Sequence, residues 1–370
     1  MANIFDYFEW RGDLSLDTAP INEVDALIFS RLSYLPFDGI ISKKIDVATA
    51  TKSLLHSDSN LRMLTCKEDK PFAEYLSKSQ RFKDLILSDY ENIIDEEKQM
   101  QFSVITIELD KDCHFISFSG TDNTVVGWQE DFNMAHMFPL PSQIKALKYL
   151  EKIARETTGE LILGGHSKGG NLSVYASAYC SKEIQNRIKA IYNFEGPGFD
   201  SKSIEQSGFK DIKDKIHTYL TQSSVIGMLF DHEEDYTIIK SRAKGFFQHD
   251  PYTWEVMQTH LIHLSELTNS SVFFDHTITQ LISDLTIEQR RDFINAVFSL
   301  INSCEDKNFI DIAEHWAKSS GAILKSFAGL DKETRNMVFS TIATFVKCAK
   351  NNFSDINPLL KKNRNRKPGG

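Results

Sequence analysis

The amino-acid sequence predicts an α/β fold with a mostly parallel central sheet, an N-terminal helical extension and a C-terminal helical subdomain. Three observations carry this prediction. Apolar residues recur at helical spacing over the first 95 residues, strand-like and helix-like segments alternate between about residues 100 and 220, and helical spacing returns after about residue 270. Strands that alternate with helices are typical of βαβ units, in which the strands run parallel.

The N-terminal extension is expected to span residues 1–95 and to pack on the core. Helical apolar spacing is found at 22–35, at 45–56, where Asp46 is a candidate N-cap, and at 71–90. A helical extension is therefore expected ahead of the first strand.

The core is expected to span residues 96–268. A hairpin is predicted at 102–109 and 113–118, because two β-rich runs flank Asp110-Lys111-Asp112. The remaining expected elements are a helix at 142–157, a strand at 160–163, a helix from Asn171, and strands at 190–194 and 215–220.

The C-terminal helical subdomain is expected at residues 269–355. Helical spacing is found at 272–284, 287–303, 308–328 and 331–351. A basic tail at 356–370 follows and is expected to be disordered and solvated. The alternative for the tail is a weak attraction to anionic membrane, a peripheral membrane contact.

Composition narrows the classes of function. The chain has 370 residues, 41% of them hydrophobic, and a net charge of −9, which argues against nucleic acid as the partner. The five cysteines are odd in number and lack Cys-x-x-Cys spacing, as in a reducing compartment. No signal peptide and no apolar run of membrane-spanning length is seen, so a cytoplasmic protein is expected.

The most informative motif is Gly165-His166-Ser167-Lys168-Gly169, between a strand-like run and a helix-like run. A Gly-x-Ser-x-Gly in this context is the nucleophile elbow of α/β-hydrolases. The tight turn exposes the serine hydroxyl and directs a helix N-terminus at the reacting carbonyl. Ser167 is therefore the candidate nucleophile. The alternative is a glycine-rich turn with an inert serine.

A second motif, Phe118-Ser119-Gly120-Thr121-Asp122, ends the predicted hairpin next to the nucleophile strand. The backbone amides of Thr121 and Lys168 are the expected oxyanion hole, since an acyl-transfer site needs two donors on the developing alkoxide. The alternative for Thr121 is an ordinary turn at the end of a strand.

A serine nucleophile needs a base, and the base needs an acid. Glu195 follows the strand after the elbow, at the edge where catalytic groups gather in α/β sheets. Among 11 histidines, His249 lies late in the chain, in the order Ser, acid, His, and His232 is its rival. The histidine would remove the proton of Ser167, and the carboxylate would hold the ring in the correct tautomer.

These motifs resemble class 3 lipases. The resemblance rests on Phe118-Ser119-Gly120-Thr121 with Trp128 and Asp131, and on Gly165-His166-Ser167-Lys168-Gly169-Gly170. The chain is more fully similar to an uncharacterised bacterial family of lipase-like α/β-hydrolases. Its hallmarks here are Phe8-Glu9-Trp10-Arg11-Gly12-Asp13-Leu14, Phe194-Glu195-Gly196-Pro197-Gly198-Phe199 and Gln248-His249-Asp250-Pro251.

The chain departs from class 3 lipases at two points. Ser119 stands where they have an Arg, and Ser223-Ser224-Val225-Ile226 stands where their acid-bearing loop lies. The acid is then either Glu195, which we favour, or Asp231 from the next loop. Lys168 opposes the helix dipole, so its side chain is expected either to reach solvent or to bind an anionic group of the substrate.

The resemblance implies a serine hydrolase (lipase or esterase) that cleaves an acyl ester or lipid through an acyl-enzyme, without metal or cofactor. Asp122, Trp128 and His166 are candidate substrate-binding residues, and 123–140 is either a lid or an amphipathic helix packed on the sheet. Two alternatives are a thioesterase and a catalytically silent scaffold that keeps the fold for binding. The oligomeric state is left open.

Overall fold

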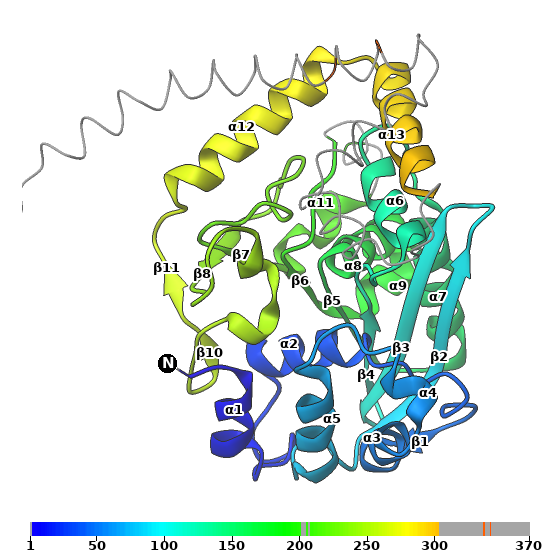
Figure 1. The fold of residues 1–370 in the computed structure, drawn as a ribbon. Coiled ribbons are helices and arrows are strands. Elements are labelled where there is room, and N and C mark those ends of the chain that lie inside the picture. Colours follow the sequence, from blue (N-terminus) through cyan, green and yellow to red (C-terminus); the bar gives the residue numbers. More distant parts are fainter. Residues whose placement is uncertain (1, 201–204, 206–207, 303–335, 337–340, 342–370) are drawn as a thin grey trace, which may run out of the picture. The chain divides into compact units, whose positions relative to one another are not determined.

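The computed structural model describes residues 2–200, 205, 208–302, 336 and 341. The chain forms two compact units (Figure 1). The first comprises residues 1–122 and 139–266, and the second comprises residues 123–138 and the chain from residue 267 onward.

A single nine-stranded sheet runs through the described part of the first unit, in the order β1-β2-β3-β4-β5-β6-β7-β8-β11. The strands from β4 to β8 pair in parallel, whereas β1 to β4 pair antiparallel and β11 closes the other edge antiparallel to β8. The bounds are β1 Ile45–Asp46, β2 Ile86–Asp95, β3 Met100–Asp110, β4 Cys113–Phe118, β5 Glu160–His166, β6 Ile188–Phe194, β7 Ile216–Thr221, β8 Tyr236–Ile239 and β11 His263–Leu264. A separate pair, β9 (Val256–Met257) and β10 (His260–Leu261), lies just before β11 in the chain.

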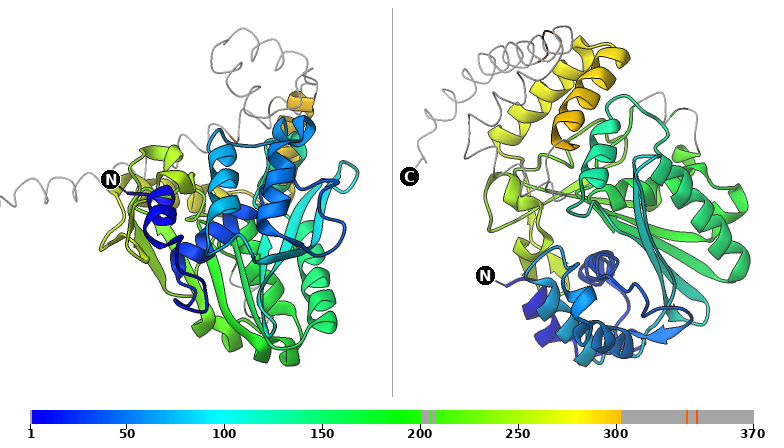
Figure 2. Two further views of the ribbon diagram at one scale, coloured as in Figure 1. Left: turned by 90° about the horizontal axis from the view of Figure 1, so that it is seen from below. Right: turned by 45° about the vertical axis from the view of Figure 1, so that its right-hand side comes forward.

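Helices cover both faces of the sheet, because successive strand residues point to opposite sides. In β5, Leu161 and Leu163 belong to one buried cluster and Ile162 to the other. Figure 2 shows the N-terminal helices in blue and the α7–α9 helices in green on opposite sides. The helices are α1 Ile4–Arg11, α2 Glu23–Leu32, α3 Val47–Leu55, α4 Asp58–Leu61 and α5 Asp69–Lys78 on one face, and α7 Pro141–Glu156, α8 Lys168–Tyr179, α9 Lys182–Arg187 and α11 Phe209–Ile212 on the other.

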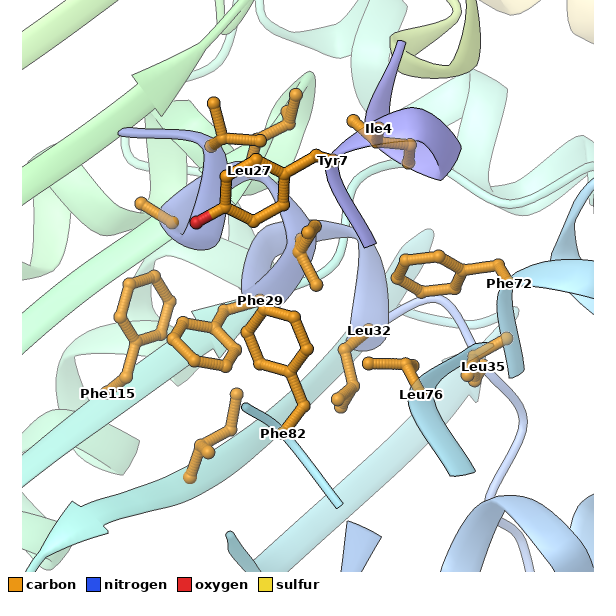
Figure 3. Packing of buried hydrophobic residues seen from close by; sticks show 14 of the residues in the cluster. Ile4, Tyr7, Leu27, Phe29, Leu32, Leu35, Phe72, Leu76, Phe82 and Phe115 are labelled. Atoms are coloured by element: carbon orange, nitrogen blue, oxygen red, sulfur yellow. The ribbon is translucent and has the colours of Figure 1, made fainter. Parts of the chain in front are cut away.

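Helix α2 is held against the sheet by buried aromatic rings (Figure 3). Phe29 of α2 lies with its ring centroid 5.6 Å from that of Phe82 and 5.2 Å from that of Phe115 in β4. All three side chains are fully buried. Aromatic contacts of this kind add to the hydrophobic stabilisation of the cluster, so α2 is a fixed part of the core.

The prediction of one helix over 71–90 was wrong beyond residue 78. Helix α5 ends at Lys78, and residues 86–95 form β2. Between them Arg81 is 1% exposed and donates to both carboxylate oxygens of Asp25 and to the carbonyl of Ala19. A buried guanidinium must be paired, and these partners draw the chain out of the helix.

The expected purely helical extension over residues 1–95 is corrected in the same way. Strands β1 and β2 lie in this segment and form one end of the central sheet. Antiparallel pairing of β2 with β3 over Ile86–Asp95 and Met100–Glu108 makes residues 86–95 part of the core. The central sheet, parallel from β4 to β8 and flanked by helices, confirms the predicted fold class.

The second unit contains α6 (Val125–Asn133), α12 (Asn269–Asp284) and α13 (Ile287–Asn302). The apolar side of α6 packs on α13: Val125, Ile294 and Phe298 are buried together with Trp128 at their edge, and the ring of Phe132 lies 5.6 Å from that of Phe298. The segment was expected to be either a lid or a helix on the sheet, within a core of 96–268. Residues 123–138 group with the C-terminal helices rather than with the core, and the lid role stays a prediction.

The helices expected at 308–328 and 331–351 and the tail at 356–370 lie outside the described residues, except for single positions. Across the residues that the structure does describe, no helix combines the length and the apolar character needed to cross a bilayer.

Candidate active site

Ser167 lies in a strained turn between β5 and α8. Its backbone has φ 58° and ψ −134°, a conformation that non-glycine residues rarely adopt. A Cβ on Gly165 would come within 2.2 Å of the Gly169 backbone, and one on Gly169 within 2.1 Å of the Phe118 carbonyl oxygen. Only glycine fits at both positions, so the turn has the close packing of a nucleophile elbow. The structure has the α/β-hydrolase fold, as the sequence predicts.

The loop that follows β4 lies directly against this serine. Strand β4 pairs in parallel with β5, with Phe118 opposite Gly165. A Cβ on Gly120 would come within 2.9 Å of the Ser167 Cβ. Thr121 follows Gly120, and Lys168 opens α8, where backbone N–H groups have no partner within the helix. Both expected oxyanion donors therefore belong to segments that border Ser167.

The Lys168 side chain neither reaches solvent nor lies open to a substrate, so both expectations for it were wrong. It is 1% exposed, and its Nζ donates at 2.8 Å to the backbone carbonyl and at 2.8 Å to the side-chain Oε1 of Gln101. The ammonium stabilises the contact between α8 and the start of β3, where two polar oxygens compensate for its burial.

Glu195 directly follows β6 and is fully buried. One carboxylate oxygen, Oε1, accepts hydrogen bonds from the backbone N–H of Thr221 at 2.6 Å and from its hydroxyl at 3.1 Å. The other, Oε2, lies 3.1 Å from Nδ1 of His249. Both oxygens are used, and the carboxylate is fixed between β7 and the histidine.

His249 ends the short 3-10 helix η2 (Gly245–His249), and its side chain is 19% exposed. It is tied to the elbow through the residue before the serine. The rings of His249 and His166 lie 4.6 Å apart, and Nε2 of His166 lies 2.8 Å from the His249 carbonyl oxygen. Ser167 in turn donates its backbone N–H to the carbonyl of Phe194, the residue before Glu195. These contacts gather Ser167, Glu195 and His249 at the carboxyl ends of β5 and β6.

The two rival residues lie in other environments. Asp231 is exposed, and its backbone pairs with Phe199 in a short antiparallel bridge. His232 has a carboxylate partner of its own, with Nδ1 3.0 Å from Glu234 Oε1, and its Nε2 lies 2.6 Å from the Gly227 carbonyl oxygen. Glu195, not Asp231, is thus the carboxylate at His249.

The three candidate substrate-binding residues belong to different elements. His166 is 4% exposed, and hydrogen bonds at both ring nitrogens turn it into the interior, so the expectation that it contacts substrate was wrong. Burial, with His249 and Arg31 nearby, holds the pKa of His166 well below its usual value. Asp122 is half-buried at the end of the Gly120–Thr121 loop in the first unit, and Trp128 belongs to α6 in the second.

Sequence reasoning missed two residues near the His249–Glu195 pair. Thr221 supplies both hydrogen bonds to Glu195 Oε1, and Tyr34 places its hydroxyl 2.9 Å from Nδ1 of His166. Neither lies in a motif. Thr221 could have been found only as the last residue of the strand that follows Glu195.

Comparisons with known proteins place the chain in a family. No curated protein matches it. Among solved structures, M37 lipase matches with a TM-score of 0.36 and 18% identity, over 56% of this chain and 70% of that one. A mutant form of MDLA from Penicillium cyclopium matches with a TM-score of 0.37 and 13% identity, over 70% of this chain and 92% of that one. At these values neither match bears on activity. The Mbeg1-like family model matches residues 76–299, more than half of the chain, and the protein therefore belongs to the Mbeg1-like family.

Proposed function

We propose that this protein is a serine hydrolase that cleaves an acyl ester, with Ser167 as nucleophile, His249 as base and Glu195 as the acid that orients it. The observation that carries the proposal is the 3.1 Å contact of Glu195 Oε2 with His249 Nδ1, beside a serine held at φ 58°. Strained backbone of this kind is found where the surrounding structure enforces a functional geometry.

The proposed reaction has two steps. In the first, the Ser167 oxygen attacks the acyl carbon while Nε2 of His249 takes the hydroxyl proton. The C–O bond to the leaving group then breaks, and His249 returns the proton to the departing alkoxide. In the second step water attacks the acyl-enzyme while His249 takes a proton from that water. The C–O bond to Ser167 then breaks, His249 returns the proton to the Ser167 oxygen, and the carboxylic acid is released.

Charge develops at two places in this reaction. The carbonyl oxygen becomes an alkoxide, for which we propose the backbone amides of Thr121 and Lys168 as donors. Removing one such donor typically costs about 10²–10³ in rate. The imidazolium of His249 is stabilised by Glu195, whose second oxygen is held by Thr221. The chemistry uses no metal or organic cofactor.

The silent-scaffold alternative was motivated by the loss of a carboxylate in the Ser223–Ile226 segment. That motive is weakened, because Glu195 occupies the position beside His249 and the backbone N–H of Ser223 donates to the side chain of Gln248 instead. The thioesterase alternative keeps the same residues and differs only in the leaving group. We keep a cytoplasmic location and a small acyl-ester or lipid substrate as part of the proposal.

Fluorophosphonate labelling tests the proposal, since only an activated serine reacts quickly. Wild-type protein should be labelled, and Ser167→Ala should lose labelling and at least about 10³ of the hydrolysis rate of p-nitrophenyl esters. A matched control is Ser173→Ala in the same helix, whose hydroxyl donates to the Gly170 carbonyl, and it should label like wild type. Equal labelling of Ser167→Ala and wild type would refute the catalytic role. Parallel assays with acyl thioesters separate esterase from thioesterase.

A further inference from the structure

We propose that Tyr34 and His166 are positioning residues for His249, and that the turn after the N-terminal helix α2 thereby sets the geometry of the catalytic base. The inference rests on the proposed function and adds residues to it. Tyr34 lies outside residues 76–299, the part of the chain that the family model matches.

The contacts form a continuous series from Tyr34, in the turn after α2, to the base. The Tyr34 hydroxyl lies 2.9 Å from Nδ1 of His166 and 3.1 Å from the His166 carbonyl oxygen. Nε2 of His166 lies 2.8 Å from the His249 carbonyl oxygen, and the two imidazole rings are 4.6 Å apart. His166 therefore touches His249 at its backbone and at its ring.

The hydrogen-bond partners determine which atom donates in each of these contacts. A carbonyl oxygen can only accept, so Nε2 of His166 must carry a proton and donate to His249. Burial keeps the His166 ring neutral, since its pKa lies well below the usual value. Nδ1 is then an acceptor, and the single proton of the Tyr34 hydroxyl is shared between this nitrogen at 2.9 Å and the His166 carbonyl oxygen at 3.1 Å. Tyr34 thus supports the tautomer of His166 that the His249 carbonyl requires.

Arg31 holds the Tyr34 ring in place. Its guanidinium carbon lies 4.2 Å from the centre of the Tyr34 ring, and its nitrogens donate to Asp69 Oδ1 at 2.5 and 3.2 Å. Its Nε also donates to the hydroxyl of Tyr252 at 3.2 Å, and Tyr252 follows His249 by three residues. One buried guanidinium therefore contacts the His249 segment both through Tyr34 and His166 and through Tyr252.

The segment around His249 depends on such contacts because it is irregular. It consists of two short 3-10 helices, η2 and η3 (Pro251–Thr253), separated by Asp250. Consecutive carbonyls are held by side chains, that of Gln248 by Nε1 of Trp254 at 2.7 Å and that of His249 by His166. Without the His166 bond the backbone that carries the base loses one of these two anchors. A base displaced by even 1 Å from its productive position can lose about 10²-fold in rate.

A matched pair of substitutions tests the proposal. The amide nitrogen of Gln can occupy the place of His166 Nε2 and donate to His249, whereas the shorter Asn side chain reaches only the place of Nδ1. His166→Gln should keep kcat within about threefold of wild type, and His166→Asn should lower kcat by about 10-fold or more with little change in KM. The two variants remove the same ring, so a general loss of packing would affect both alike.

Tyr34→Phe provides an independent measurement should His166→Asn fail to fold. It should lower kcat by about 3- to 10-fold with KM unchanged. The control is Tyr149→Phe, which removes another buried hydroxyl with two partners, Thr106 and the Asp89 carbonyl, and should leave kcat unchanged.

The outcomes separate this inference from the proposed function. If wild-type protein is not labelled by fluorophosphonate, the proposed function fails. If wild type is labelled and His166→Asn and His166→Gln have equal kcat, or Tyr34→Phe matches Tyr149→Phe, the positioning role is overturned and the triad stands. A KM rise without a fall in kcat overturns it as well, because misplacement of the base acts on the chemical step.

Discussion

The protein contains two histidine–glutamate pairs with similar geometry, His249 with Glu195 and His232 with Glu234. In each, Nδ1 of the histidine faces a buried glutamate: His249 and Glu195 at 3.1 Å, His232 and Glu234 at 3.0 Å. In each, the glutamate also accepts from a threonine hydroxyl of β7, Thr221 for Glu195 and Thr218 for Glu234.

The second nitrogen and the neighbours distinguish the two pairs. Nε2 of His232 lies 2.6 Å from the Gly227 carbonyl oxygen, and the side chain is 6% exposed. Burial favours a low pKa for His232, but the hydrogen bond and charge of Glu234 outweigh it and raise the pKa. His249 is 19% exposed and lies beside the residue that precedes Ser167. A histidine–carboxylate contact is therefore not sufficient to identify a base. Its place relative to the nucleophile decides.

The largest expected effect comes from exchanging the two histidines for alanine. His249→Ala should lower the rate of ester hydrolysis by at least about 10³, as Ser167→Ala does, because triad members act as a unit. His232→Ala should leave the rate of the folded protein within a few-fold of wild type. Rates are compared at equal folded fraction, measured by circular dichroism. The reverse ranking would transfer the role of base to His232.

The carboxylates form the next comparison. Glu195→Gln keeps the shape but removes the charge and the tautomer preference, and should cost about 10²–10⁴ in kcat. Glu234→Gln should change kcat by less than threefold. Steady-state kinetics on a p-nitrophenyl ester decide between them, and similar losses in both variants would argue against a dedicated acid.

A smaller change in kcat is expected for substitutions of the two β7 threonines, Thr221 and Thr218. Thr221→Val removes one of the two donors to Glu195 Oε1 while the backbone N–H at 2.6 Å remains, so kcat should fall only about 3- to 10-fold. Thr218→Val removes the 2.6 Å bond to Glu234 and should leave kcat unchanged. Equal kcat in the two variants would contradict the assigned role of Thr221.

The smallest effect on rate, and a distinct one on stability, is expected for His232→Gln. The pKa of His232 is raised in the folded protein. Its contribution to the free energy of unfolding is therefore fully present below pH 6.5, the usual pKa of a histidine, and is lost as the pH rises through the pKa of the folded state. Burial disfavours the ionised form of Glu234, but the hydrogen bond and charge of His232 outweigh burial and lower the pKa of Glu234. The contribution of Glu234 to the free energy of unfolding is therefore present above pH 4.5, the usual pKa of a glutamate, and is lost as the pH falls.

The pair should therefore stabilise the protein most between about pH 4.5 and 6.5. The difference in free energy of unfolding between wild type and His232→Gln should reach about 1–3 kcal/mol there and shrink by pH 9. Denaturant titrations across this range measure it. A difference that is constant with pH would mean that the pair is not ionised.

Much of the fold follows from local pattern. The strands predicted at 102–109, 113–118, 190–194 and 215–220 are β3, β4, β6 and β7, and the helix predicted at 142–157 is α7. These segments have apolar residues at a regular period and clear turn residues between them. The helix predicted over 71–90 failed where the pattern conflicts with a long-range need, the pairing of the buried Arg81 with Asp25.

In the candidate active site, too, the features that depend on neighbouring residues in the sequence could be predicted. The elbow could be predicted from five residues because strand, glycines and serine are contiguous, and the requirement for Gly165 and Gly169 is local backbone packing. The choice of Glu195 over Asp231 followed from the fixed position of a residue at the end of a strand. In the structure that carboxylate faces His249, and Asp231 is exposed.

By itself, then, the sequence determined most elements of the core from β3 to β7, their alternation and the position of Ser167, because each depends on neighbours in the chain. Only the tertiary structure decided which side chains surround His249. Tyr34, in the turn after α2, contacts the His166 ring that packs on His249, Arg31 of α2 lies over the Tyr34 ring, and Thr221 fixes Glu195 from β7. Such contacts join residues far apart in the chain, and no local period or motif records them. Lys168 shows the same limit: its ammonium is buried because β3 happens to offer two oxygens of Gln101 at that point.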